Sequence, residues 1–271
     1  MARTLATRSV RPFVGSRGTG FAGPLTAPSV GGGCPTRSAG NLGASNNTSM
    51  KLYTAPLSMF GAKVQIAALE KGLAFDYEMV PFDRDDHYEP KHPEVLRINP
   101  KRQVPVLIDG DVELFDSTQI FEYLEDIAPE PPLWPGKAAQ RALARQLEHL
   151  SDEVFFPHVI RLMSLQHDMQ SEAAIAACAG CAQFYERMEE RLAQGDYLAG
   201  AYSFADIALY MAHVFADRKG AGMTDATPRL LAWRERIGAR PPVREVVGRM
   251  MAFLASQGRP VPVYLQPLLG A

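Results

Sequence analysis

The sequence predicts an α/β N-terminal domain followed by an all-α C-terminal domain. Strand-like and helix-like segments alternate between residues 50 and 130, whereas amphipathic helical patterns alone fill residues 136–258. A proline-rich stretch at 129–135 separates the two parts, because no helix continues through it. With 271 residues, 46% of them apolar, the chain is long enough to bury the cores of two modest domains.

The first 49 residues differ from the rest of the chain. They contain five arginines, no lysine and no acidic residue among many Gly, Ser, Thr and Ala residues, which predicts a disordered extension. This composition is typical of a mitochondrial or plastid transit peptide, and the apolar segment of a secretory signal is absent. The alternative is a misassigned start with Met50 as the true first residue, because Met50 leads directly into a strand pattern.

The charge of the remaining residues argues against a general nucleic-acid binder. Beyond the extension, 23 basic residues face 30 acidic ones, which leaves about seven net negative charges. No stretch approaches the run of about 18 apolar residues that a membrane span needs. We therefore expect no membrane or nucleic-acid partner, and a cytoplasmic protein, or an organellar one if residues 1–49 are a transit peptide.

The three cysteines do not predict a redox or metal site. Cys34 lies in the extension, and Cys178 and Cys181 are spaced i, i+3 within an Ala-rich helical run. A redox CxxC motif should follow a strand, and a zinc site needs further ligands nearby. We interpret Cys178 and Cys181 as small core-packing residues and expect no metal.

The N-terminal domain begins with a βαβ unit. Lys51–Ala55 predicts a strand, and Gly61–Glu70 predicts a helix that Gly72 ends. Phe75–Val80 alternates apolar and acidic residues, which predicts a second strand. A helix between two strands is a crossover, so the two strands should be parallel.

A ββα unit completes this domain. After an irregular, proline-containing stretch from Pro81 to Pro100, Val104–Ile108 and Val112–Phe115 predict a hairpin around the turn Asp109-Gly110. The next helix begins at Asp116 or Ser117, and its apolar stripe consists of Ile120, Phe121, Tyr123, Leu124 and Ile127.

The C-terminal domain is predicted to be helical throughout. Its amphipathic runs are Lys137–Ser151, Pro157–Gln170, Ser171–Gln194, Ser203–Arg218, Pro228–Gly238 and Val243–Gln257. Ser203-x-x-Asp206 has the spacing of a capping box just before an apolar run, with the shorter Asp in place of Glu. Residues 259–271 are predicted to be a tail.

This order of elements resembles the thioredoxin-like fold, and with the helical half it resembles the glutathione transferase family. Each motif alone is weak, but their order and spacing together are specific, and the serine after the first strand is similar to that of the bacterial-type, theta/zeta-like serine classes. The residues that carry the resemblance are Ser58, Asn99-Pro100, Gln103-Val104-Pro105, Asp116-Ser117, Ser203-x-x-Asp206 and Trp233–Pro241.

The resemblance implies that the tripeptide glutathione binds to the N-terminal domain. Asp116-Ser117 lies at a helix start, where free N–H groups hold a carboxylate, so it would take the γ-glutamyl end, with Asp116 on the ammonium. Val104-Pro105 would be a cis bond whose Val104 backbone pairs with the cysteinyl residue. Arg102 and Gln103 lie beside this edge. The glycyl carboxylate would contact one of His87, His92, Lys101 or Arg102.

Ser58 is the expected catalytic residue. In the serine classes a hydroxyl between the first strand and the first helix stabilises the thiolate, with help from the positive end of the helix dipole. The alternative is a serine that only caps the helix. Tyr53 is disfavoured because it lies within the strand. By the same resemblance, residues of the second-substrate pocket would include Phe60, Phe155, Phe156 and His158, although such aromatic residues more often lie in the core.

The function implied by the resemblance is transfer of glutathione, as a thiolate, to a small electrophile, as in detoxification. Conjugation is the default, and dehalogenation, ether cleavage and cis/trans isomerisation stay open. The rival classes are a non-catalytic interaction module that keeps the fold and a carrier that binds glutathione without turnover. The resemblance also implies a homodimer.

Overall fold

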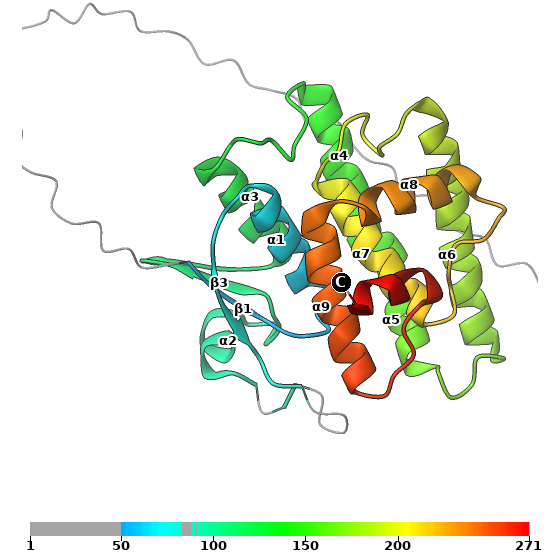
Figure 1. The fold of residues 1–271 in the computed structure, drawn as a ribbon, viewed down its shortest axis with the longest axis horizontal. Helices are drawn as coiled ribbons and strands as arrows, with labels where there is room; N and C mark the ends of the chain where they lie inside the picture. Colours follow the sequence, from blue (N-terminus) through cyan, green and yellow to red (C-terminus); the bar gives the residue numbers. More distant parts are fainter. Residues whose placement is uncertain (1–49, 83–87, 90, 271) are drawn as a thin grey trace, which may run out of the picture. The chain divides into compact units, whose positions relative to one another are not determined.

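Among the residues that the structure describes, a four-stranded mixed sheet and three helices form the N-terminal part of the chain (Figure 1). The computed structural model describes residues 50–82, 88–89 and 91–270, so the predicted extension 1–49 and His87 lie outside the described residues. The elements are β1 (Lys51–Thr54), α1 (Met59–Glu70), β2 (Asp76–Met79), α2 (Pro93–Ile98), β3 (Val106–Asp109), β4 (Val112–Phe115) and α3 (Ser117–Ile127).

The sheet has the strand order β2-β1-β3-β4. β1 pairs with β2 in parallel, which confirms the predicted crossover, and β3 pairs with β4 antiparallel, which confirms the hairpin. The structure corrects one expectation, because helix α2 forms within the stretch predicted to be irregular. Pro93 occupies the first turn, where it costs no hydrogen bond, and His92 Nδ1 accepts the Glu94 N–H at 3.2 Å.

Six α-helices make up the C-terminal part among the described residues, as the amphipathic runs predict. They are α4 (Ala138–Leu150), α5 (Phe156–Ser164), α6 (Glu172–Arg191), α7 (Phe204–Arg218), α8 (Pro228–Gly238) and α9 (Pro241–Ser256). Two short segments were not predicted: a π-helical turn, η1 (Ser151–Phe155), and a 3₁₀ helix, η3 (Val263–Gly270), which lies against α9 (Figure 1). The run predicted to be helical up to Gln194 ends in a 3₁₀ turn, η2 (Leu192–Gln194). None of the described helices is long and apolar enough to span a membrane.

Helix α1 belongs to two hydrophobic cores. Val64 and Ala68 pack with sheet residues, whereas Ile66 and Ala67 pack into the core of the helical part. Nine residues of this 12-residue helix are buried, which explains its small, Ala-rich sequence: short side chains let neighbours approach on both sides. The two predicted domains therefore pack against each other through α1, which contacts α7 and α9.

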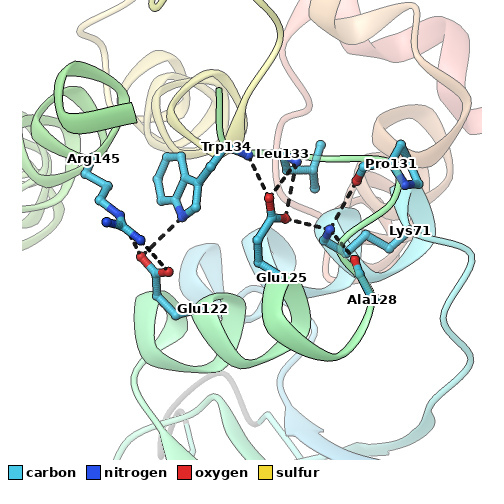
Figure 2. Close-up of polar contacts among 8 residues, drawn as sticks. All are labelled: Lys71, Glu122, Glu125, Ala128, Pro131, Leu133, Trp134 and Arg145. Atoms are coloured by element: carbon cyan, nitrogen blue, oxygen red, sulfur yellow. Dashed lines mark hydrogen bonds and ion pairs between the residues drawn. The ribbon is translucent and has the colours of Figure 1, made fainter. Parts of the chain in front are cut away.

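Glu125 of α3 fixes the proline-rich linker in place (Figure 2). Its carboxylate accepts the backbone N–H groups of Leu133 at 3.1 Å and Trp134 at 3.0 Å, and lies 2.5 Å from the buried Lys71 Nζ. The same ammonium donates to two linker carbonyls, those of Ala128 (2.7 Å) and Pro131 (3.1 Å). The linker forms no helix or strand that would pair its backbone N–H and C=O groups with one another. The clamp of Glu125 and Lys71 supplies hydrogen-bond partners for these groups instead.

Glu122, one turn before Glu125, holds the same linker from its exposed side (Figure 2). It accepts Trp134 Nε1 at 3.2 Å and pairs with Arg145 of α4 at 3.0 Å. The Glu122–Arg145 pair is partly exposed, so water screens it. Glu125 and Glu122 of α3 thus both bind the linker and a basic side chain, but the pair of Glu125 is buried and that of Glu122 is partly exposed to water.

We predict that Glu125→Ala lowers the free energy of unfolding by about 3 kcal/mol, because it leaves the buried Lys71 ammonium without its counter-charge. Glu122→Ala, the matched control, should cost about 1 kcal/mol. Urea denaturation of both variants measures the difference. Equal losses would show that burial of the clamp is not what stabilises the linker.

The predicted capping box at the start of α7 is confirmed. Asp206 Oδ2 accepts the Ser203 N–H at 2.9 Å and the Ser203 hydroxyl at 3.1 Å. Asp206 Oδ1 accepts two further donors, the Leu198 N–H at 3.0 Å and Trp233 Nε1 at 2.9 Å. Burial raises the pKa of Asp206 to about 6, against the opposing effect of these hydrogen bonds. One carboxylate therefore joins the start of α7 to α8 and to the preceding loop.

His213 of α7 is a buried neutral imidazole that ties η3 to the helical core. Its Nδ1 lies 3.2 Å from the Tyr185 hydroxyl and its Nε2 lies 3.3 Å from the Tyr264 hydroxyl of η3. Burial, with help from Arg234, lowers the pKa of His213 to about 3. In the same core Cys181 is buried and unpaired, as the core-packing interpretation expects, and Cys178 packs beside it.

His213 should make the protein less stable in acid. The His213 imidazole binds a proton below about pH 6.5 in the unfolded state but only below about pH 3 in the folded state. The free energy of unfolding therefore falls as the pH is lowered from 6.5, by about 1.4 kcal/mol per pH unit. The raised pKa of Asp206 makes the protein more stable as the pH falls, but it does so equally in the parent and in His213→Gln. The comparison of the two proteins therefore isolates the effect of the histidine. Urea denaturation from pH 7 to about 4 should give a flatter curve for His213→Gln; parallel curves would contradict the assignment.

Candidate functional site

Two adjoining pockets contain most of the predicted site residues. Pocket 1, of about 440 Å³, is lined by Pro105, Asp116 and Ser117 and by residues of α4, η1 and α5. Pocket 2, of about 350 Å³, is lined by Ser58, Arg102 and a largely apolar wall. Both pockets share four lining residues: Phe60, Gln103, Val104 and Phe156.

Ser58 is the N-cap of α1 and faces pocket 2. Its Oγ accepts the Gly61 N–H at 3.0 Å and donates no hydrogen bond among the described residues, so its proton is free for a ligand. Gly61 is required here because a Cβ at this position would collide with the Thr54 side chain. The capping role and the proposed donor role of Ser58 are compatible, since they use different parts of one hydroxyl.

Asn99 shapes the loop that leads to Val104. Its Nδ2 donates to the Gln103 carbonyl at 2.6 Å, and its Oδ1 accepts the Lys101 N–H at 2.9 Å. The Val104–Pro105 bond is cis, as the resemblance implied. The Val104 N–H and C=O have no partner among the residues that the structure describes, so an extended peptide can pair with them.

Asp116 caps α3 and has a strained backbone. Its φ is 74°, a region that non-glycine residues seldom adopt. Its Oδ1 accepts the N–H of Thr118 at 3.0 Å and, more weakly, that of Gln119 at 3.4 Å. The Ser117 N–H has no partner in the described part of the chain, so it remains free for an anion at the helix start.

Basic residues gather at pocket 2. Lys91, His92 and Arg102 line it, and the His92 ring lies 4.8 Å from that of Tyr53. Arg102 has a φ of 57°, so the loop turns sharply beside Val104. Lys101, another candidate for the glycyl carboxylate, lines pocket 1 instead.

A buried ion cluster lies behind pocket 1. Lys63 of α1 is fully buried, and its Nζ lies 2.8 Å from Glu148 and 2.5 Å from Asp152. Thr118 Oγ1 donates to Glu148 at 2.7 Å, which links the cluster to the start of α3. Both carboxylates line the pocket, so α1, α4 and η1 meet at its wall.

The cluster has perturbed pKa values because three charges share a site with little water. Burial raises the pKa of Asp152 to about 6, with help from Glu148 and against Lys63. Burial also acts against ionised Glu148, but Lys63 and the Thr118 hydroxyl outweigh it and lower the pKa of Glu148. Desolvation would lower the pKa of Lys63, yet the two carboxylates raise it. Lys63 therefore stays charged at neutral pH.

Two predicted residues of the second-substrate pocket lie elsewhere. Phe155 is fully buried in the helical core, 5.2 Å from Tyr185, and His158 packs against Gly180 of α6. Neither lines pocket 1 or pocket 2, because η1 and α5 turn these side chains toward α6. Phe60 and Phe156 do line both pockets, with their rings 5.4 Å apart and edge-to-face.

Sequence reasoning missed the ion cluster. The one signal was Lys63 in the middle of a mostly apolar helix, which also fits an exposed charge. Glu148 and Asp152 are spaced i, i+4, a common pattern on exposed helix faces. Among the described residues, no group of three or more His, Cys, Asp or Glu side chains suits a metal ion.

The N-terminal domain is thioredoxin-like, with a serine at the start of α1 and a cis Val104–Pro105 bond beside an unpaired backbone edge, and a helical domain closes its pockets. These features define a class of two-domain ligand-binding proteins. The chain matches the family profiles described as "Glutathione S-transferase, N-terminal domain" over residues 52–132 and "Glutathione S-transferase, C-terminal domain" over residues 149–241. It is 33% identical over 210 residues to glutathione S-transferase 3 of Zea mays, covering 73% of this chain and 93% of that protein. The chain belongs to the glutathione S-transferase family of enzymes.

Two further comparisons agree with this membership. The chain is 38% identical over 109 residues to glutathione S-transferase 1 of Dianthus caryophyllus, covering 40% of this chain and about half, 48%, of that relative. A solved structure of glutathione S-transferase-I bound with lactoylglutathione is similar at a TM-score of 0.64 and 25% identity, covering 74% of this chain and all of that one. The predicted fold, thioredoxin-like followed by all-helical, is confirmed.

We predict that Lys63→Met lowers the free energy of unfolding by about 3 to 5 kcal/mol, because it leaves two buried carboxylates facing each other without a counter-charge. Lys101→Met removes an exposed lysine from the lining of pocket 1, which the ion cluster adjoins, and should change stability by less than about 0.5 kcal/mol. Urea denaturation at neutral pH compares the two. A loss below about 1 kcal/mol for Lys63→Met would mean that the ion pairs do not stabilise this wall.

Proposed function

We propose that this enzyme activates glutathione as a thiolate, with Ser58 as the hydroxyl donor, and transfers it to a small electrophile. The observation that carries the proposal is the position of Ser58, at the N-terminus of a helix and on the wall of a pocket that Val104 also lines. A hydroxyl proton and a helix N-terminus both stabilise a negative sulfur. Ser58 is a donor in this proposal, and the sulfur is the nucleophile.

The shared residues Gln103 and Val104 suggest how the tripeptide lies. Its cysteinyl backbone would pair with the free Val104 N–H and C=O, and its γ-glutamyl carboxylate would reach the free Ser117 N–H in pocket 1. Its glycyl carboxylate would then face the basic side of pocket 2, where Arg102 and His92 lie. With its γ-glutamyl end in pocket 1 and its glycyl end in pocket 2, the tripeptide would have its sulfur beside Ser58.

The second substrate would occupy the apolar side of pocket 2. Phe60, Phe156, Met163 and Phe215 line it, so an apolar electrophile has a wall close to the proposed sulfur position. In the similar glutathione S-transferase-I structure the ligand is lactoylglutathione, so a group on the glutathione sulfur is compatible with this fold. Conjugation remains the default, and the serine-class assignment, homodimer formation and cytoplasmic location remain predictions.

Ser58→Ala should restore the thiol pKa of bound glutathione. In the parent we expect a value about one to two units below the ordinary thiol value of about 8.5, and in Ser58→Ala a value close to ordinary, with kcat/KM lower by about 10²-fold. The ultraviolet absorbance of the thiolate, titrated with pH on the bound complex, measures this shift.

Ser171→Ala is the control, because Ser171 likewise caps its helix, α6, by accepting the N–H three residues on, that of Ala174 at 3.3 Å, and lies outside both pockets. Its hydroxyl also donates to the Asp168 carbonyl at 2.7 Å. Ser171→Ala should lose a similar capping energy of about 1 kcal/mol and leave the thiol pKa unchanged. Saturable binding with an ordinary thiol pKa in the parent would instead identify a carrier, and absence of binding would favour the interaction module.

A further inference from the structure

Three basic side chains gather where α7 ends and after α9. Arg218 is the last residue of α7, Lys219 follows it, and Arg259 lies just beyond the end of α9. All three are partly exposed to solvent. Among the residues that the structure describes, none of the three has a carboxylate within ion-pair distance, and Nε and Nη1 of Arg218 make no hydrogen bond. We call these residues the cation cluster.

The charges of the cation cluster repel one another. Burial, together with the charge of Arg259, lowers the pKa of Arg218 to about 10. Burial and the charges of both arginines lower the pKa of Lys219. Like charges held close together disfavour the charged form of each group, and a negative charge placed among them removes this penalty. The cluster is therefore suited to an anion.

The cation cluster lies beside aromatic residues that line pocket 2. Phe215 of α7 lines this pocket, and Arg218 Cζ lies 4.8 Å from the centre of its ring. Tyr88 also lines the pocket, and its ring lies 5.0 Å from that of Phe82. Arg259 Cζ in turn lies 5.5 Å from the Phe82 ring centre. Two residues of the pocket wall thus connect pocket 2 to the cluster.

The cation cluster is separate from the basic residues that line pocket 2 itself. Under the proposed function, His92 and Arg102 of the thioredoxin-like domain face the glycyl carboxylate of glutathione. The cluster belongs to the helical domain and adjoins Phe215, one of the residues proposed to contact the second substrate. Its charge is therefore not needed to bind glutathione.

We infer that the second substrate is an apolar electrophile that carries an anionic group such as a carboxylate, and that the cation cluster binds this group. The inference rests on the proposed function, because it assumes that glutathione supplies the sulfur. With the reacting carbon near Ser58 and the apolar body against Phe215, the anionic group would extend to Arg218 and Arg259. A guanidinium can bind a carboxylate through two parallel hydrogen bonds. The cluster selects the substrate and takes no part in activating the sulfur.

The test uses two glutathione derivatives that differ in charge but hardly in shape, S-(p-carboxybenzyl)glutathione and S-(p-carbamoylbenzyl)glutathione. By isothermal titration calorimetry the parent should bind the carboxylate about tenfold or more tightly than the amide, since charge-assisted hydrogen bonds are the stronger ones. In the double variant Arg218→Gln/Arg259→Gln this preference should fall to within about twofold, with the affinity for the amide unchanged. A loss of structure alone would weaken both derivatives.

Two control variants separate charge from position. Arg218→Lys/Arg259→Lys keeps both charges and should retain most of the preference for the carboxylate. Arg244→Gln removes an exposed arginine of α9 that lines neither pocket, and it should keep the full preference of the parent.

A parent that binds both derivatives equally overturns the inference, because the cluster would then be neutralised within the chain, for example by Asp83, Asp85 or Asp86, which lie outside the described residues. A double variant that keeps the tenfold preference also overturns it, and places the anion on the basic side of pocket 2.

The remaining outcomes concern folding and the proposed function. If the double variant fails to fold, Lys219→Gln and Arg259→Gln decide singly: each should lower the preference about threefold, and no change in either overturns the inference. A parent that binds glutathione but neither derivative overturns the inference alone. A parent that does not bind glutathione overturns the proposed function as well.

Discussion

The fully buried Lys63 ammonium is the constraint on which the arrangement of both domains depends. An isolated charge in that position would be too costly to bury, so α4 and η1 have to bring Glu148 and Asp152 within 2.8 and 2.5 Å of it. The π-helical turn η1 follows α4 directly at this point, and such turns often occur at functional sites. The same contacts that neutralise Lys63 build the wall of pocket 1.

Helix α1 combines the structural and the proposed chemical roles. Its buried faces join the sheet to the helical core, its N-cap is Ser58, and its middle carries Lys63. A helix packed on both sides has little freedom to move, so its N-terminal dipole keeps a fixed direction toward pocket 2. The linker clamp around Glu125 and Lys71 adds a second fixed connection at the other end of this helix (Figure 2).

The two pockets differ in charge in a way that suits a zwitterionic peptide. Pocket 1 is rich in carboxylates around Asp152 and has a free helix N–H at Ser117, whereas pocket 2 has Arg102 and His92 beside an apolar wall. A ligand with an ammonium and a carboxylate at one end and a second carboxylate at the other meets complementary groups along its length. Val104 lies in both pockets, and under the proposed function its unpaired backbone would fix the register of such a ligand.

The sequence alone determined the order of the strands and of the helices other than α2, the cap at Asp116, the capping box of Ser203 and Asp206, and the serine after β1, because these depend on periodicity and on local hydrogen-bonding chemistry. Only the tertiary structure decided that Lys63 is buried and that Phe155 faces the core instead of a pocket. A lysine or a phenylalanine on a helix has the same local pattern whether it faces water, core or ligand. Its environment is set by residues such as Glu148, which lies 85 positions along the chain from Lys63.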